Sequence, residues 1–186
     1  MGREIIADKR PLKKSENTYD WLGHGFYFWE FNPARARSFA EERAKRKLGA
    51  TAIEKPFVLG AVIDLGYCWN LLDETGIQVL KQGFETLSDT FEQTGRSLPE
   101  NEPADEPLKR NLDCAIIETV HKLNESPEKR SFDSIRGVFP EGDLLYPGAG
   151  VREKNHIQIC VRNPNCIKGF FVPRELDPDY PRPNTG

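Results

Sequence analysis

The chain has 186 residues, of which 38% are hydrophobic and 30% charged, which is enough for a single domain with its own core. A formal net charge of −3 excludes a generally basic surface, so a nucleic-acid partner would need a local basic patch. Because no apolar run reaches the roughly 18 residues of a membrane span, and the first residues lack the apolar segment of a signal peptide, we expect a cytoplasmic protein without a membrane partner.

The cysteines and histidines give no metal-binding pattern. The four cysteines lie in no C-x-x-C spacing: Cys68, Cys114, Cys160 and Cys166. Two of them stand in apolar runs, where cysteine behaves as a small hydrophobic residue. The three histidines are scattered along the chain. We therefore predict reduced, cytosolic thiols and no metal site.

The first elements in chain order are a short helix, a loop, an aromatic strand and a long helix. Their predicted ranges are 3–9, 11–23, 25–30 and 33–48. Asn32 is a good helix cap and Pro33 fits the first helical position. The other face of this helix is basic, with Arg35 at its start. This basic run is typical of a solvated helix face, and the alternative is a site for an anionic macromolecule.

The rest of the chain is predicted to form strands and two further helices. "PFVLGAVIDLG" is a nearly continuous apolar run, which favours a central strand. The remaining predictions are a helix over 74–94, a mobile Pro- and Glu-rich insertion over 95–107, a helix over 108–125, and strands over 132–139, 156–161 and 167–173. We expect His121, near the end of the second of these helices, to lie on the surface or to interact with the C-terminal helix dipole. We expect the last two strands to form a hairpin.

This order predicts an α+β fold with a mostly antiparallel sheet and flanking helices. Residues 1–174 form its single domain, and residues 175–186 are expected to be a disordered tail. In the strand over 156–161 the residues should alternate between two faces, with Ile157, Ile159 and Val161 on one of them.

The stretch "LGHGFYFWE" places aromatic residues directly after two glycines. Gly23 and Gly25 flank His24, and Phe26 and Tyr27 follow. Glycine lets a flat ring approach the backbone, so this pattern suits a nucleotide or nicotinamide site. The alternative on periodicity alone is that these aromatic residues belong to the core.

The stretch "LGHGFYFWEFNPARARSFAEE" resembles the second motif of the ADP-ribosyltransferases of the His-Tyr-Glu kind, which include diphtheria toxin and the poly-ADP-ribose polymerases. A later stretch, with "HIQICVRNPNCI", resembles bacterial members of toxin or phage-defence type. The resemblance covers about residues 3–174. It implies the split antiparallel sheet of this fold with NAD in its cleft, Tyr27 stacked on the nicotinamide, and Gly23, Gly25 and Phe26 at the cleft wall.

Two features depart from the pattern of that superfamily. Its first strand, with a His-Gly-Thr motif, has no counterpart here, and residues 3–9 resemble the helix that follows it. The position of the catalytic glutamate falls on His156, or on Gln158 if the register differs by two. The nearest acids in the sequence are Glu153 and Glu141. A glutamine would stabilise the positive charge that develops on the ribose less than a carboxylate would. A movement of Glu153 into the site would supply that carboxylate.

Ser134 and Arg136, in "FDSIRG", are candidates to contact the ribose or pyrophosphate of NAD, with a salt-bridged strand arginine as the alternative. The resemblance implies transfer of ADP-ribose from NAD to a macromolecular acceptor, protein or nucleic acid, by a bacterial toxin or anti-phage effector that an antitoxin could silence. The alternatives are an inactive module that binds NAD, ADP-ribose or a partner, and an NAD glycohydrolase.

Overall fold

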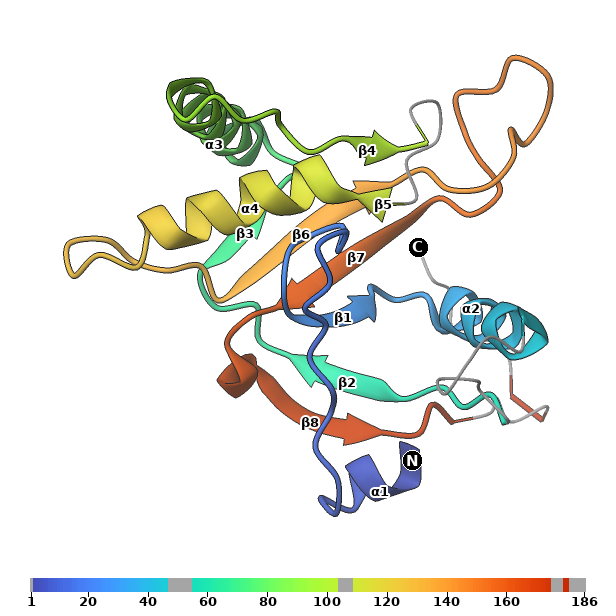
Figure 1. The fold of residues 1–186 in the computed structure, drawn as a ribbon. Coiled ribbons are helices and arrows are strands. Elements are labelled where there is room, and N and C mark those ends of the chain that lie inside the picture. The colour runs from blue at the N-terminus through green and yellow to red at the C-terminus, as the bar shows by residue number, and fades with distance from the viewer. Residues whose placement is uncertain (1, 47–54, 104–108, 175–178, 181–186) are drawn as a thin grey trace.

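A four-stranded sheet with the strand order β1-β7-β6-β3 forms the centre of the molecule (Figure 1). The computed structural model describes residues 2–46, 55–103, 109–174 and 179–180. The described helices are α1 (Gly2–Ile6), α2 (Pro33–Arg46), α3 (Glu74–Gln93) and α4 (Asn111–Leu123). The described strands are β1 (Phe26–Trp29), β2 (Gly60–Ile63), β3 (Cys68–Asn70), β4 (Asn101–Glu102), β5 (Lys109–Arg110), β6 (Ser134–Phe139), β7 (His156–Val161) and β8 (Ile167–Phe171).

The pairing of these strands confirms the predicted α+β class with a mostly antiparallel sheet. β7 pairs with both β1 and β6 in antiparallel fashion, and β3 joins β6 in parallel. Two smaller antiparallel sheets pair β2 with β8 and β4 with β5. This establishes the fold class, while the more specific ADP-ribosyltransferase fold stays a prediction.

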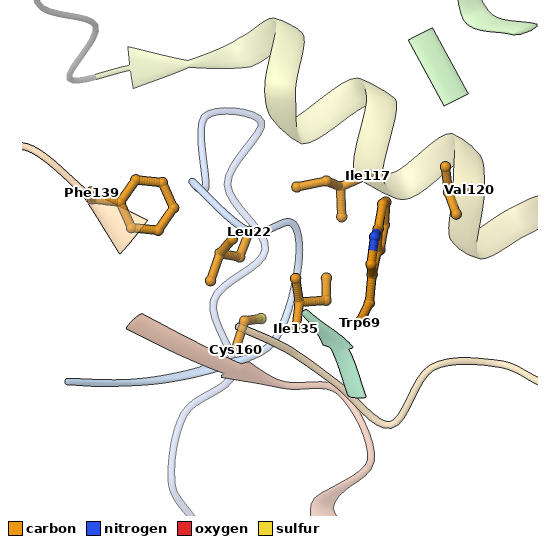
Figure 2. Packing of buried hydrophobic residues seen from close by; sticks show 7 residues of the cluster. All are labelled: Leu22, Trp69, Ile117, Val120, Ile135, Phe139 and Cys160. Atoms are coloured by element: carbon orange, nitrogen blue, oxygen red, sulfur yellow. The ribbon is translucent and has the colours of Figure 1, made fainter. Parts of the chain in front are cut away.

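The face of the central sheet that carries the first core packs against α4 (Figure 1). The most buried members of this core come from the sheet, from α4 and from the segment before β1, as Figure 2 shows: Leu22, Trp69, Ile117, Val120, Ile135, Phe139 and Cys160. The indole nitrogen of Trp69 donates a hydrogen bond to the carbonyl oxygen of Gly76 at 2.9 Å, so the start of α3 is tied to β3.

The opposite face of the sheet carries a second core. Ile159 and Val161 pack there with Ile63 of β2 and Ile167 of β8. Cys160, between them in sequence, belongs to the first core, so β7 alternates between the two faces as the sequence predicts. Strands that are buried on both sides explain why this part of the sequence is so apolar.

Three expectations about individual elements are wrong. β2 is not a central strand, because it pairs only with β8 among the described strands. β7 and β8 form no hairpin: a 3₁₀ turn over Pro164–Cys166 directs the chain into the second sheet. His121 is 3% exposed instead of lying on the surface.

Two other expectations are tested only in part. The segment 95–107 contains β4, and its residues 104–107 lie outside the described residues. Most of the tail over 175–186 also lies outside them, as do residues 47–48 of the predicted second helix.

Candidate functional site

The pairing of β1 with β7 brings together two motifs that are about 130 residues apart in the sequence. Tyr27 lies opposite Cys160 and Trp29 lies opposite Gln158 in this antiparallel pair. Residues opposite each other share a face of the sheet. Tyr27 and Cys160 both pack in the first core, so Trp29 and Gln158 lie on the same face, toward α4. We call this surface the Gln158 face.

Gln158 is held by a hydrogen bond to His156 on the same strand. The Nδ1 atom of His156 lies 2.6 Å from the carbonyl oxygen of Lys154, which can only accept, so Nδ1 carries the proton. Burial lowers the pKa of His156, which keeps its ring neutral near pH 7. The Nε2 atom of His156 therefore accepts a hydrogen bond from the amide nitrogen of Gln158 at 2.8 Å. This orientation leaves the amide oxygen of Gln158 for another partner.

Aromatic rings surround His156. Its ring centroid lies 6.1 Å from that of Trp21, 6.4 Å from that of Trp29 and 6.2 Å from that of Phe139. His156 is buried, whereas Gln158 is partly exposed. Of the two positions that the sequence left open for the superfamily glutamate, Gln158 is thus the partly exposed one, and His156 is the buried one that holds its amide nitrogen.

The carboxylate near this pair belongs to Glu141, in the loop after β6. Its Oε2 atom lies 3.8 Å from Nδ1 of His156. Both carboxylate oxygens of Glu141 accept hydrogen bonds from Nη2 of Arg35, at 2.8 and 2.9 Å. Glu153 is exposed, and its backbone nitrogen donates to the carbonyl oxygen of Asp143. A role for Glu153 in the site would therefore require its loop to rearrange.

Buried hydrogen-bond donors without an acceptor gather beside the Gln158 face. Within the described part of the chain, Nε1 of Trp29 and both Nε and Nη1 of Arg35 have no hydrogen-bond partner. Nη1 of Arg35 lies 3.8 Å from a carboxylate oxygen of Glu42, which is an ion-pair contact and too long for a hydrogen bond. Buried donors are rarely left unpaired, so a hydrogen-bond acceptor from outside the described residues would stabilise these three nitrogen atoms.

Tyr27 has a structural role in the turn that precedes its own strand. Its hydroxyl accepts a hydrogen bond from the backbone nitrogen of Leu22 at 2.8 Å and donates one to the carbonyl oxygen of Gly23 at 2.6 Å. Burial raises the pKa of this hydroxyl. Gly25 has no room for a side chain, because a Cβ atom there would meet Sγ of Cys160. The stacking of Tyr27 on nicotinamide stays a prediction.

Replacing Gly23 by alanine is expected to destabilise the fold by about 2–3 kcal/mol. Gly23 has a φ of +71°, and a Cβ atom would lie 2.5 Å from the Glu118 carboxylate and 2.7 Å from Cγ2 of Ile117. Gly150→Ala is the matched control, since Gly150 has no positive φ and no atom lies within 4 Å of the methyl group that alanine would add there. Denaturant unfolding measures both, and equal stability of the two variants would contradict the structural role of Gly23.

The other predicted contacts to NAD lie on the opposite face of the sheet from Tyr27 and Gln158. Phe26 packs in the second core. Ser134 donates a hydrogen bond to the carbonyl oxygen of Leu65 at 2.6 Å. Arg136 binds a carboxylate oxygen of Glu30 through Nε and Nη2, at 2.8 and 2.7 Å. The structure thus does not bring all the predicted site residues into one cluster.

An ion pair that sequence reasoning missed joins α4 to the ends of β1 and β7. Glu118 accepts hydrogen bonds from the guanidinium of Arg162 and, at 2.8 Å, from the backbone nitrogen of His24. Burial alone would raise the pKa of Glu118, but these hydrogen bonds outweigh it and the pKa is lowered. His24 is thereby a neighbour of this ion pair, with Nδ1 3.5 Å from Glu118.

His121, one turn further along α4, is a neutral buried histidine. Burial lowers its pKa from 6.5 to about 4, and the positive charge of Arg162 acts in the same direction against the opposing effect of Glu118. Its ring makes edge contacts with Trp69 and Phe132.

The folding stability should therefore fall as the pH is lowered from about 6.5 to about 4. Below pH 6.5 the unfolded chain binds a proton at His121 that the folded chain excludes, so the free energy of unfolding falls until the pH reaches the pKa of the folded state. The total decrease in this free energy from His121 is roughly 3 kcal/mol. His121→Phe should remove this part of the pH dependence in denaturant unfolding at pH 7 and pH 4.5. An identical pH dependence in the variant would refute the assignment.

Comparisons with known proteins assign no family. No family model and no solved structure matches the chain. The uncharacterized protein MJ0359 of Methanocaldococcus jannaschii is 27% identical over 184 aligned positions, which cover 89% of this chain and 79% of that protein. Among the described residues, no helix is long and apolar enough to cross a membrane, and no cluster of three or more potential ligands could hold a metal ion.

Proposed function

We propose that the protein binds NAD and transfers its ADP-ribose to a macromolecular acceptor, protein or nucleic acid. The observation that carries this proposal is the pairing of β1 with β7, which places Tyr27, Trp29 and Gln158 on one face. The two strands are those on which the resemblance to ADP-ribosyltransferases rests. Their adjacency is what a shared nicotinamide site requires.

In this reaction the bond between the ribose and the nicotinamide nitrogen breaks, and its electron pair leaves with nicotinamide. Positive charge then develops on the ribose until an acceptor oxygen or nitrogen forms the new bond. The free amide oxygen of Gln158 is the group on this face that can interact with the ribose, because His156 holds the amide nitrogen. A neutral oxygen stabilises positive charge less than a carboxylate, so we expect slow turnover.

The unpaired donors beside this face suit the acceptor groups of NAD. Nε1 of Trp29 and the free nitrogens of Arg35 would pair with a carboxamide or phosphate oxygen once a ligand opened access to them. We propose that the protein acts as a bacterial toxin or phage-defence effector, with an antitoxin as a further partner.

An inactive module that binds NAD or ADP-ribose is the second candidate. It is favoured by the internal hydrogen bonds of Tyr27, Ser134 and Arg136, and by the absence of a carboxylate at position 158. An NAD glycohydrolase, with water as the acceptor, is the third.

Product analysis after incubation with NAD and a cell extract separates these three functions. The proposal predicts free nicotinamide together with an ADP-ribosylated macromolecule, detected by mass spectrometry. Free ADP-ribose in an amount equal to the nicotinamide would indicate a glycohydrolase. NAD binding without nicotinamide release would indicate the inactive module. No binding of NAD would exclude both enzymes and would leave only a module that binds ADP-ribose.

A further inference from the structure

The hydrogen bond between His156 and Gln158 depends on the protonation state of the imidazole ring. In the neutral ring Nδ1 donates to the carbonyl oxygen of Lys154 at 2.6 Å, and Nε2 accepts from the amide nitrogen of Gln158 at 2.8 Å. In the protonated ring both nitrogens are donors. Nε2 would then face the amide nitrogen, which is also a donor, and the hydrogen bond between them would be lost.

A rotation of the terminal amide of Gln158 by half a turn restores this hydrogen bond. The oxygen and the nitrogen of an amide are similar in size, so the rotation exchanges them without needing more space. The protonated Nε2 can then donate to the amide oxygen, while Nδ1 keeps its bond to Lys154. The amide nitrogen turns away from His156. Because Gln158 is partly exposed, water or a ligand can accept a hydrogen bond from it.

The charged groups around His156 act in both directions. Burial lowers its pKa, while the hydrogen bond to Lys154 and the carboxylate of Glu141, with Oε2 at 3.8 Å from Nδ1, raise it. The positive charges of Arg35 on α2 and Arg110 at the start of α4 lower it. The net pKa is lower than 6.5, so the ring takes up its proton at mildly acidic pH.

His121 is a buried histidine without such an arrangement. Its Nε2 atom has no hydrogen-bond partner among the described residues, and burial lowers its pKa to about 4. At His156 the second ring nitrogen faces an amide group, which can accept a hydrogen bond as well as donate one. Of these two buried histidines, His156 is therefore the one for which the fold supplies an acceptor for the added proton.

We propose that His156 is a pH-dependent switch that decides which end of its amide Gln158 presents on the Gln158 face. The neutral ring leaves the amide oxygen for a ligand, and the protonated ring leaves the amide nitrogen. The consequence for catalysis rests on the proposed function. In that reaction the oxygen stabilises the positive charge on the ribose and the nitrogen does not, so acidification should slow the release of nicotinamide.

An NMR titration of the ¹⁵N-labelled full chain from about pH 8 to about pH 5, without NAD, tests the switch itself. At pH 8 the proton should lie on Nδ1 of His156. Below pH 6.5, Nε2 should become protonated, and the side-chain amide signals of Gln158 should shift with the same midpoint. The amide of Gln78, on an exposed position of α3, is the control and should not follow this transition.

Three results of this titration would overturn the proposal. They are a proton on Nε2 at pH 8, protonation of His156 with unchanged amide signals of Gln158, and a ring that stays neutral for as long as the chain is folded. Circular dichroism at each pH shows whether it is folded. Because the titration contains no NAD, its outcome does not depend on the proposed function.

Two variants test the coupling between the two side chains. His156→Phe keeps a ring but cannot titrate, so the amide signals of Gln158 should lose their transition, whereas His24→Phe should retain it. Gln158→Leu removes the acceptor of the protonated ring and should move the midpoint of His156 about one pH unit lower. A transition that persists in folded His156→Phe would overturn the proposal. So would an unchanged midpoint in Gln158→Leu, which serves if His156→Phe does not fold.

The rate of nicotinamide release against pH tests the consequence for catalysis. In the wild type it should fall about 10-fold, with the midpoint found for the amide signals. A constant rate, in a protein whose amide signals do shift, would contradict the role of Gln158 in the proposed reaction.

Discussion

Replacing Gln158 by glutamate is expected to raise the rate of nicotinamide release about 100-fold. The new carboxylate would lie beside the ribose and stabilise the positive charge that develops as nicotinamide leaves. It would also face the lone pair of Nε2 of His156, which now accepts from the amide nitrogen. Protonation of His156 would relieve that contact, so the pKa of His156 should rise in the variant.

Chromatographic measurement of nicotinamide against time gives this rate, with NAD at saturating concentration. Gln78→Glu makes the same change on an exposed position of α3 and should release nicotinamide at the wild-type rate. A folded Gln158→Glu variant that is no faster than this control would show that position 158 does not serve the departing ribose.

Replacing Tyr27 by alanine is expected to cost about 4 kcal/mol of stability, and replacing it by phenylalanine about 2 kcal/mol. The alanine variant loses a ring that packs against the first core as well as the hydroxyl. The phenylalanine variant keeps the ring but leaves the backbone nitrogen of Leu22 and the carbonyl oxygen of Gly23 without their partner. Urea unfolding of both variants gives these two values.

The same pair of variants separates the ring from the hydroxyl in NAD binding. If the ring stacks on nicotinamide, Tyr27→Phe keeps its affinity for NAD under conditions where it is folded. Tyr146→Phe, on an exposed loop position, is the control for loss of a hydroxyl and should change neither property. A phenylalanine variant as stable as the wild type would contradict the role of the hydroxyl in the turn.

Local patterns in the sequence predicted most helices and strands well. The apolar periodicity of α3 and α4 and the alternation of β7 depend on neighbours a few residues away, and both are confirmed. The central position of β2 and the hairpin partner of β8 were predicted wrongly, because pairing depends on residues about a hundred positions apart. His121 was placed on the surface because a polar residue near a helix end usually lies there.

The candidate site was predicted only in outline, because its contacts also join residues that are far apart in the sequence. The sequence named both His156 and Gln158, but burial and hydrogen bonding were needed to distinguish their positions. Arg35 belonged to a basic run that favoured a solvated face, yet it is 7% exposed and bound to Glu141. Its partner lies 106 residues away, and no short motif marks such a pair.

Calorimetric titration of NAD into the wild-type chain and into Gln158→Ala tests whether position 158 belongs to an NAD site. We expect the wild type to bind NAD and the folded variant to bind it about 10-fold more weakly, because the ribose loses its hydrogen-bond partner. Equal affinities in the two proteins, or no binding of NAD by the wild type, would contradict this expectation.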